Sequence, residues 1–246
     1  MVWRCSPLNA ALCITGSFME SKVVETFSEY IQEIENMDDG AELMLYRGQV
    51  TKGNLLPSIC RDKPEVDTTQ EEKEMLSELR RMGNSLVTDP SISDWDLLVV
   101  AQHFGMKTRL LDWTSNPLAA LWFACNDWKG GDTHVYILPA DEFLSKSKKG
   151  PFDIGGTRVI RPSLNNPRII SQHGWFTAHK YSNKTNKFVA LEKNKEIKKA
   201  VKEIKIPSRN RSDMLKSLDR HGVSSRTLFP DLEGLCKYLN WKHGNA

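Results

Sequence analysis

Apolar residues recur at helical spacing in several stretches of the chain. The interval 22–37 has a single apolar face, which predicts an amphipathic helix. Thr69 and Glu72 stand at the spacing of a capping box and predict the start of a second helix. Ser93 and Gly105 are suited to begin and to end a third helix.

The second half of the chain alternates short apolar runs with further helical patterns. The interval 118–125 is apolar nearly all round and predicts a buried helix, and helices are also predicted at 212–221 and 231–241. Strands are predicted at 42–47, 108–113, 133–138, 157–160, 168–171, 188–191 and 203–206. This order favours an α+β fold, a mixed irregular β-sheet flanked by helices, over a doubly wound one.

Composition is that of an ordinary globular protein, with 39% hydrophobic and 26% charged residues in 246. No apolar run is long enough for a spanning helix, so no membrane partner is expected. Residues 1–18 differ in character and are expected to form a flexible extension, and 19–246 a single domain. The five cysteines are scattered without a C-x-x-C pair, which favours a reducing, cytoplasmic compartment.

Charge is uneven along the chain. From Lys184 to Arg220, 12 Lys and Arg residues stand against 5 Asp and Glu residues, although the net charge of the whole chain is only +3. Such a segment could face nucleic acid. Aromatic residues do not interleave with these lysines as in a base-stacking groove, so a solvated surface is the other interpretation.

Two segments are candidates for chemistry. In Tyr46-Arg47-Gly48, an arginine at a strand end beside glycine can present its guanidinium to a phosphate or a carboxylate, or form a surface salt bridge. The second segment, 102–115, is dense in polar side chains between elements that are expected to be buried. Its polar members are Gln102, His103, Lys107, Thr108, Arg109, Asp112, Thr114 and Ser115.

Other interpretations of this second segment stay open. Arg109 and Asp112 could pair with each other, and Ser115 could act only as a helix cap. His103 and Asp112 could also serve as base and orienting acid in a metal-free hydrolase or nuclease. The histidines show no metal-ligand spacing, so no metal site is expected.

The order of these motifs resembles the FRG domain family. Tyr46-Arg47-Gly48 is followed by Gln-His-aromatic-Gly-x-x-Thr-Arg-Leu-Leu-Asp-Trp-Thr over 102–114 and by Ala-Leu-Trp-Phe-Ala over 120–124. The resemblance extends over about residues 22 to 241, and Lys107 stands where proline is expected. Members of the family are mostly encoded by bacteria or phages and are poorly characterised, so the resemblance implies a family more than a reaction.

A second resemblance is to the ADP-ribosyltransferase superfamily, which implies an ADP-ribosyltransferase-like fold and NAD as the cofactor. In that pattern Arg47 holds NAD, and Ser115 with Thr114 orients the ribose. Gln172 stands in the third motif, where the superfamily has a glutamate, and Glu192 is the alternative acid. The remaining residues expected to line or support the pocket are Tyr46, Gly48, Gln102, His103, Arg109, Asp112, Trp113 and Arg168.

Three functions follow from these patterns. The first is ADP-ribosyl transfer from NAD to a nucleic acid or a protein acceptor. The second is a non-catalytic module that binds a nucleotide or nucleic acid, and the third is the metal-free hydrolase or nuclease.

Overall fold

The computed structural model describes residues 19–37, 40–86, 91–127, 130–146, 149–164 and 166–244, so the extension expected at 1–18 lies outside the described residues. The helices are α1 (Phe27–Asn36), α2 (Thr69–Met82), α3 (Asp94–His103), α4 (Pro117–Asn126), α5 (Pro167–Ser171), α6 (Arg211–Arg220), α7 (Ser225–Leu228) and α8 (Leu232–Lys242). The strands are β1 (Ser21–Val23), β2 (Met44–Gln49), β3 (Leu110–Thr114), β4 (Thr133–Pro139), β5 (Arg158–Ile160), β6 (Gly174–Ala178), β7 (Tyr181–Ser182), β8 (Lys187–Phe188) and β9 (Lys202–Ile206).

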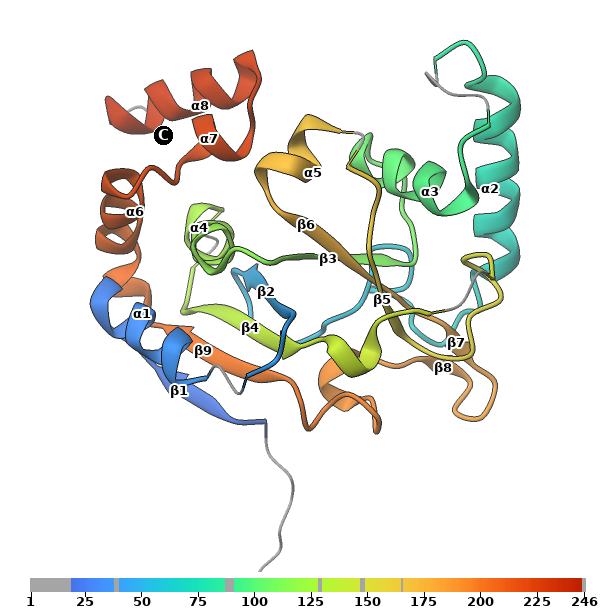
Figure 1. Ribbon diagram of the computed structural model, residues 1–246, viewed down its shortest axis with the longest axis horizontal. Coiled ribbons are helices and arrows are strands. Elements are labelled where there is room, and N and C mark those ends of the chain that lie inside the picture. Colours follow the sequence, from blue (N-terminus) through green and yellow to red (C-terminus); the bar gives the residue numbers. More distant parts are fainter. Residues whose placement is uncertain are drawn as a thin grey trace, which may run out of the picture.

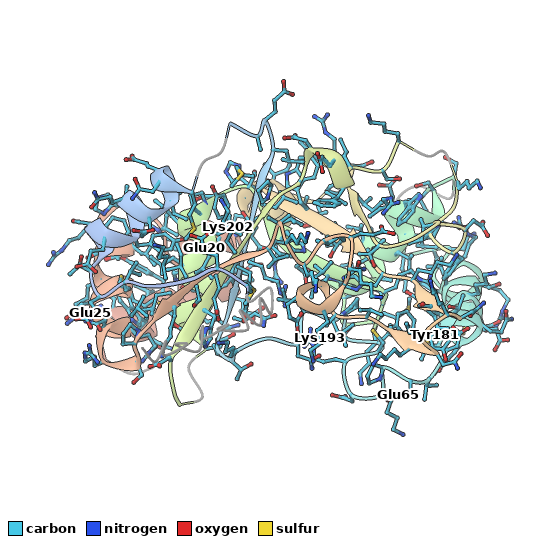
Figure 2. All side chains as sticks on the ribbon, turned by 90° about the horizontal axis from the view of Figure 1, so that it is seen from below. Glu20, Glu25, Glu65, Tyr181, Lys193 and Lys202 are labelled. Carbon is cyan, nitrogen blue, oxygen red and sulfur yellow. The ribbon has the colours of Figure 1, made fainter. Side chains whose placement is uncertain are left out.

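The main sheet has the strand order β1-β9-β4-β2-β3-β6-β5 (Figure 1). β1 runs parallel to β9, and the other neighbours are antiparallel, so the sheet is mixed. The expected α+β fold with a mixed, helix-flanked sheet is therefore confirmed. β7 and β8 form a separate hairpin, where the hydroxyl of Tyr181 donates a hydrogen bond to the Glu65 carbonyl at 3.1 Å (Figure 2).

Three apolar clusters hold the layers together. On one face of β2, β4 and β9, helices α1, α4 and α6 bury residues such as Tyr30, Leu121 and Met214 (Figure 1). A second cluster lies on the other face of β2 and β4 and extends to β3 and β5, under the loops around Leu55 and Leu191. A third joins α2, α3 and α5 to β3, β5 and β6. The sheet is thus covered by different helices toward its two ends.

Local signals placed most helices correctly. α3 has Ser93 as its N-cap, with the side chain accepting from the Asp96 N–H, and α4 has Asn116 as its N-cap followed by Pro117. The helix expected at 22–37 is shorter, because its first residues form β1 beside β9 and α1 begins only after the Thr26 cap.

The strand expected at 168–171 is wrong. This segment forms α5, because the side chain of Asn166 caps the Arg168 N–H and Pro167 occupies the first helical position. The real strand of this region, β6, comes directly afterwards and had no separate prediction.

The capping box of α2 is also wrong, although the helix does begin at Thr69. Its N-cap residue is Thr68, which makes no capping hydrogen bond with its side chain. Glu72 is completely buried and binds Arg109 instead of the helix terminus. Both carboxylate oxygens of Glu72 accept from Arg109, one from its side chain and one from its backbone N–H, which satisfies the buried charge away from the helix terminus.

Candidate functional site

The candidate site lies where β2 and β3 separate. Tyr46 of β2 is paired with Thr114 of β3, whereas β2 continues beside β4 from Met44 to Gln49. Arg47, expected at the end of its strand, therefore lies within β2. Beyond the paired residues, its Nη1 donates to the carbonyl oxygen of Asp112 at 2.7 Å, so a side chain spans the two strands in place of the backbone ladder.

A pocket of about 760 Å³ opens at this separation. Its lining residues are Tyr46, Arg47, Gly48, Gln49, Val50, Thr51, Asn54, Arg61, Asp112, Trp113, Thr114, Phe123, Asp127 and Gln172. The volume falls in the range of ordinary small-molecule sites. The pocket combines residues from three of the expected motifs, at 46–48, 112–114 and 172.

Arg47 is the main cation of the pocket wall, and its side chain is only 15% exposed. Its Nε donates to Gln49 Oε1 at 2.9 Å, and its Nη1 lies 3.9 Å from Asp112 Oδ2. Burial lowers the pKa of the Arg47 guanidinium to about 10, and the Asp112 carboxylate opposes this shift. The group therefore stays charged at neutral pH while it is poorly hydrated, which favours binding of an anion.

Gly48 is required by the packing of α4 against β2. A Cβ at this position would collide with the carbonyl oxygen of Ala120 and the backbone nitrogen of Ala124. The Tyr-Arg-Gly motif thus joins two functions: the arginine enters the pocket, and the glycine lets the helix approach the strand closely.

Asp112 presents a carboxylate at the pocket rim, with its side chain 64% exposed. Its Oδ1 accepts a hydrogen bond from Gln102 Nε2 at 2.6 Å, and Thr108 donates to Gln102 Oε1 at 2.5 Å. This chain of contacts orients the carboxylate from the last turn of α3. Gln102 therefore supports the site from outside the pocket lining.

Thr114 and Gln172 close the opposite wall. The hydroxyl of Thr114 donates to the carbonyl oxygen of Gln172 at 2.6 Å. The side-chain amide of Gln172 donates to the Leu228 carbonyl at 3.1 Å, which ties the pocket to α7. Ser115 is bound through its backbone N–H to the carbonyl of His173 and is not among the lining residues.

Arg109 was expected in the pocket and lies instead in the core, 1% exposed. Its Nε donates to Glu72 Oε2 at 2.7 Å, and its backbone N–H donates to Glu72 Oε1 at 2.6 Å. The alternative pairing with Asp112 is not formed. Trp113 is also buried, with its Nε1 bonded to Thr177 at 3.1 Å, so only the edge of this residue can contribute to the wall.

His103 and Arg168 lie together outside the pocket. Arg168 forms an ion pair of 2.6 Å with Asp231, the N-cap of α8. Burial, followed by the nearby charge of Arg168, lowers the pKa of His103. The hydrogen bonds and ion pairs of Asp112 go to Gln102 and Arg47, so the structure provides no contact between His103 and Asp112 that supports the hydrolase hypothesis.

Glu192 supports the loop that forms one rim of the pocket. Its two carboxylate oxygens accept from the backbone N–H groups of Asn54 and Leu55 at 2.9 and 3.1 Å. Gly53 donates its N–H to the Tyr136 hydroxyl at 2.6 Å, and its carbonyl accepts from Gln49 Nε2 at 2.9 Å. The carboxylate is thus engaged in shaping the loop and is not among the residues that line the pocket.

Several lining residues were missed by the sequence interpretation. Gln49 follows Arg47 by two positions in a strand, which is the signal for sharing its face. Phe123 belongs to the helix expected at 118–125 to be wholly buried, and Asp127 follows that helix. Asn54 and Arg61 lie in a loop without a motif. Among the described residues, no group of three His, Cys, Asp or Glu side chains could share a metal ion.

This geometry defines a class of protein: a mixed α+β fold with a pocket where the two central strands β2 and β3 separate. The family model of the FRG domain matches residues 42–132, a shorter range than the resemblance expected from the sequence. This range contains β2, β3, α4 and the Arg47–Asp112 contact, so this part of the chain is similar to the FRG domain. No curated protein and no solved structure matches the chain. No helix in the described part of the chain is long and apolar enough to cross a membrane.

Proposed function

We propose that this chain binds NAD in the pocket between β2 and β3 and transfers its ADP-ribose group to an acceptor. The observation that carries the proposal is the adjacency of three strands in the order β2-β3-β6. β2 and β3 bear Arg47 and Thr114, and Gln172 lies two residues before β6, at the end of α5. These are the three motifs through which the sequence resembles the ADP-ribosyltransferases, and they are remote from one another in the chain.

Arg47 would bind the diphosphate of NAD. Its Nε and Nη1 are held by Gln49 and by the Asp112 carbonyl, which fixes the direction of the guanidinium. A fixed guanidinium in a poorly hydrated wall binds phosphate oxygens strongly and with defined geometry. This role needs the positive charge, which Arg47 keeps at neutral pH.

Asp112 would stabilise the charge that develops during the reaction. Cleavage of the nicotinamide–ribose bond leaves its electron pair on nicotinamide and builds positive charge on the ribose, to which the acceptor's nucleophile then bonds. An oriented carboxylate in the pocket stabilises that charge and can take the proton released by the acceptor. Asp112 meets both conditions, because it lines the pocket and is oriented by Gln102.

Gln172 and Thr114 would hold the ribose. Both line the pocket, and the Thr114 hydroxyl and the Gln172 backbone are already joined. An amide side chain can hydrogen-bond the ribose hydroxyls without adding charge. In this proposal the charge therefore comes from Asp112, and Gln172 serves for positioning.

The test is NAD consumption by purified protein, with an untreated and a nuclease-treated lysate as sources of nucleic-acid and protein acceptors. Arg47→Ala, Asp112→Asn and Gln172→Ala are compared with wild type. Arg81→Ala is the matched control, because Arg81 is 68% exposed and pairs with Glu78 on α2. A loss of about 100-fold or more is expected for Arg47→Ala and Asp112→Asn, with the control unchanged. Equal turnover in wild type and Arg47→Ala would overturn the proposal.

A non-catalytic nucleotide-binding module is the second candidate. It is favoured by the neutral amide at the third motif and by the engagement of Glu192 with the 53–55 loop. Its signature is NAD binding, measured by calorimetry, that is lost in Arg47→Ala while no sample consumes NAD.

A further inference from the structure

A second pocket, of about 520 Å³, lies between α4, α6, α7 and α8. Three of its walls come from the consecutive helices α6, α7 and α8, which gather beside α4, a helix that is remote from them in the chain (Figure 1). Of the sequence motifs described above, the segment 120–124 contributes to it, through Trp122. Its volume is sufficient for a ligand of nucleoside size.

The two pockets meet at the last turn of α4. Asp127 lines both of them, whereas Trp122 lines the second and Phe123 lines the first. The rings of Trp122 and Phe123 are edge-to-face, with centroids 5.3 Å apart. A ligand in the second pocket would therefore be separated from the first by little more than one helical turn.

The lining of the second pocket is aromatic and rich in hydrogen-bonding groups. Tyr238 and Trp241 of α8 lie there with ring centroids 6.2 Å apart, and Trp241 is only partly buried. Asp219, Asn126 and Asn240 provide acceptors and amide donors in the same wall. A planar heterocycle with ring nitrogens and an exocyclic amino group matches this combination, because it can stack and hydrogen-bond at once.

Basic side chains flank the aromatic wall. The guanidinium of Arg226 and the ammonium of Lys242 each lie 5.3 Å from the centre of the Tyr238 ring. Both residues are exposed, so they can reach phosphates outside the pocket while the ring remains in its wall. Basic groups around an aromatic platform are the arrangement by which proteins bind single-stranded nucleic acid.

We propose that the second pocket receives one base of a single-stranded nucleic acid, with Arg226 and Lys242 on the neighbouring phosphates. The role of that strand as the acceptor of ADP-ribose rests on the proposed function, because the strand would pass Asp127 and reach the first pocket. The binding itself does not rest on it. The interpretation against a base-stacking groove concerned residues 184–220, whereas Arg226, Trp241 and Lys242 lie beyond that segment, on α7 and α8.

The test is fluorescence anisotropy of a labelled ten-nucleotide single-stranded DNA of mixed sequence, without NAD. Trp241→Leu removes the ring that is best placed for stacking, and Trp95→Leu is the matched control, because Trp95 is a partly buried tryptophan of the third apolar cluster on α3. We expect Trp241→Leu to raise Kd about tenfold or more at fixed salt, and Trp95→Leu to leave it within about twofold. Unchanged affinity in Trp241→Leu, or no binding by wild type at low salt, would overturn the proposal.

A second pair of variants keeps the test decisive if Trp241→Leu folds poorly. Arg226→Ala and Lys242→Ala change exposed residues, and each should lower the slope of log Kd against log salt by about 0.7. The control is Lys187→Ala, an exposed residue of β8, for which the slope should not change. If all three variants keep the wild-type slope, the oligonucleotide binds at another surface and the proposal is overturned. Oligonucleotide binding without NAD turnover would contradict the proposed function and leave this pocket intact as a binding site.

Discussion

The ion pair between Glu72 and Arg109 gives the sharpest prediction for stability. Both side chains are almost fully buried, at 0% and 1% exposure. Besides its two bonds to Glu72, Arg109 donates to the Pro151 carbonyl at 3.4 Å and lies 4.5 Å from the centre of the Phe152 ring. The pair is therefore the polar centre of the contact between α2, the start of β3 and the 151–152 turn.

Removing one partner leaves the other charge buried without compensation. Arg109→Leu and Glu72→Met should each lower the free energy of unfolding by about 3–5 kcal/mol. In the double variant no charge remains, but the backbone N–H of Arg109 loses its acceptor, which costs about 1–3 kcal/mol. The double variant should therefore be more stable than either single variant, although each single change removes part of the same contact.

The measurement is urea denaturation followed by circular dichroism for wild type, both single variants and the double variant. The exposed pair Arg81–Glu78 is the control, and Arg81→Leu should leave the free energy of unfolding nearly unchanged, because an exposed ion pair contributes little to stability. Additive losses in the double variant, or an Arg109→Leu protein as stable as wild type, would refute this reasoning. The second result would also restore Arg109 as a candidate for substrate binding.

Three further perturbations test other parts of the fold. Gly48→Ala should destabilise the protein by about 1–3 kcal/mol or more, because its Cβ meets the Ala120 carbonyl, and a melting temperature within error of wild type would contradict the close approach of α4 to β2. Burial lowers the pKa of His179 to about 3, so the folded protein favours the neutral imidazole. The stability linked to this histidine is complete above the pKa of about 6.5 that it has in the unfolded chain, and it is lost as the pH falls. The free energy of unfolding should therefore decrease by about 2 kcal/mol between pH 7 and 5, and His179→Leu should remove this part of the pH dependence. Arg168→Ala removes the ion pair to Asp231 at the start of α8 and should speed proteolysis of the C-terminal helices, so an unchanged rate of limited digestion would show that the contact does not hold them.

Elements with local capping signals could be predicted from the sequence. Ser93 and Asn116 cap their helices as residue type and position suggest, and β4 follows from a short apolar run. The segment 168–171 shows the limit, since Ile169 and Ile170 favour a strand while the decisive residue, Asn166, precedes the apolar pair. A cap outweighs the β preference of two residues.

The candidate site likewise has a part that the sequence predicts and a part that it does not. The motifs grouped Arg47, Asp112 and Gln172, and the structure places all three in the lining of one pocket, while their roles stay a prediction. The pairing of Arg109 could not be predicted, because its partner Glu72 lies 37 positions earlier and carries a signal for a helix start. Contacts at that separation depend on how helices pack on the sheet, which spacing along the chain does not encode.

The loop held by Glu192 has a consequence for the thermodynamics of binding. Four hydrogen bonds, to Glu192, Tyr136 and Gln49, already fix the backbone of residues 53–55, where Gly53 and Asn54 adopt left-handed conformations. Ordering a free backbone costs about 1–2 kcal/mol per residue. The conformational entropy of this loop is already lost when the chain folds. A ligand that contacts Asn54 therefore binds without the additional free-energy cost of ordering the loop. Glu192 takes no part in bond breaking, but it would raise the affinity for the ligand by restricting the conformations of the loop before the ligand binds.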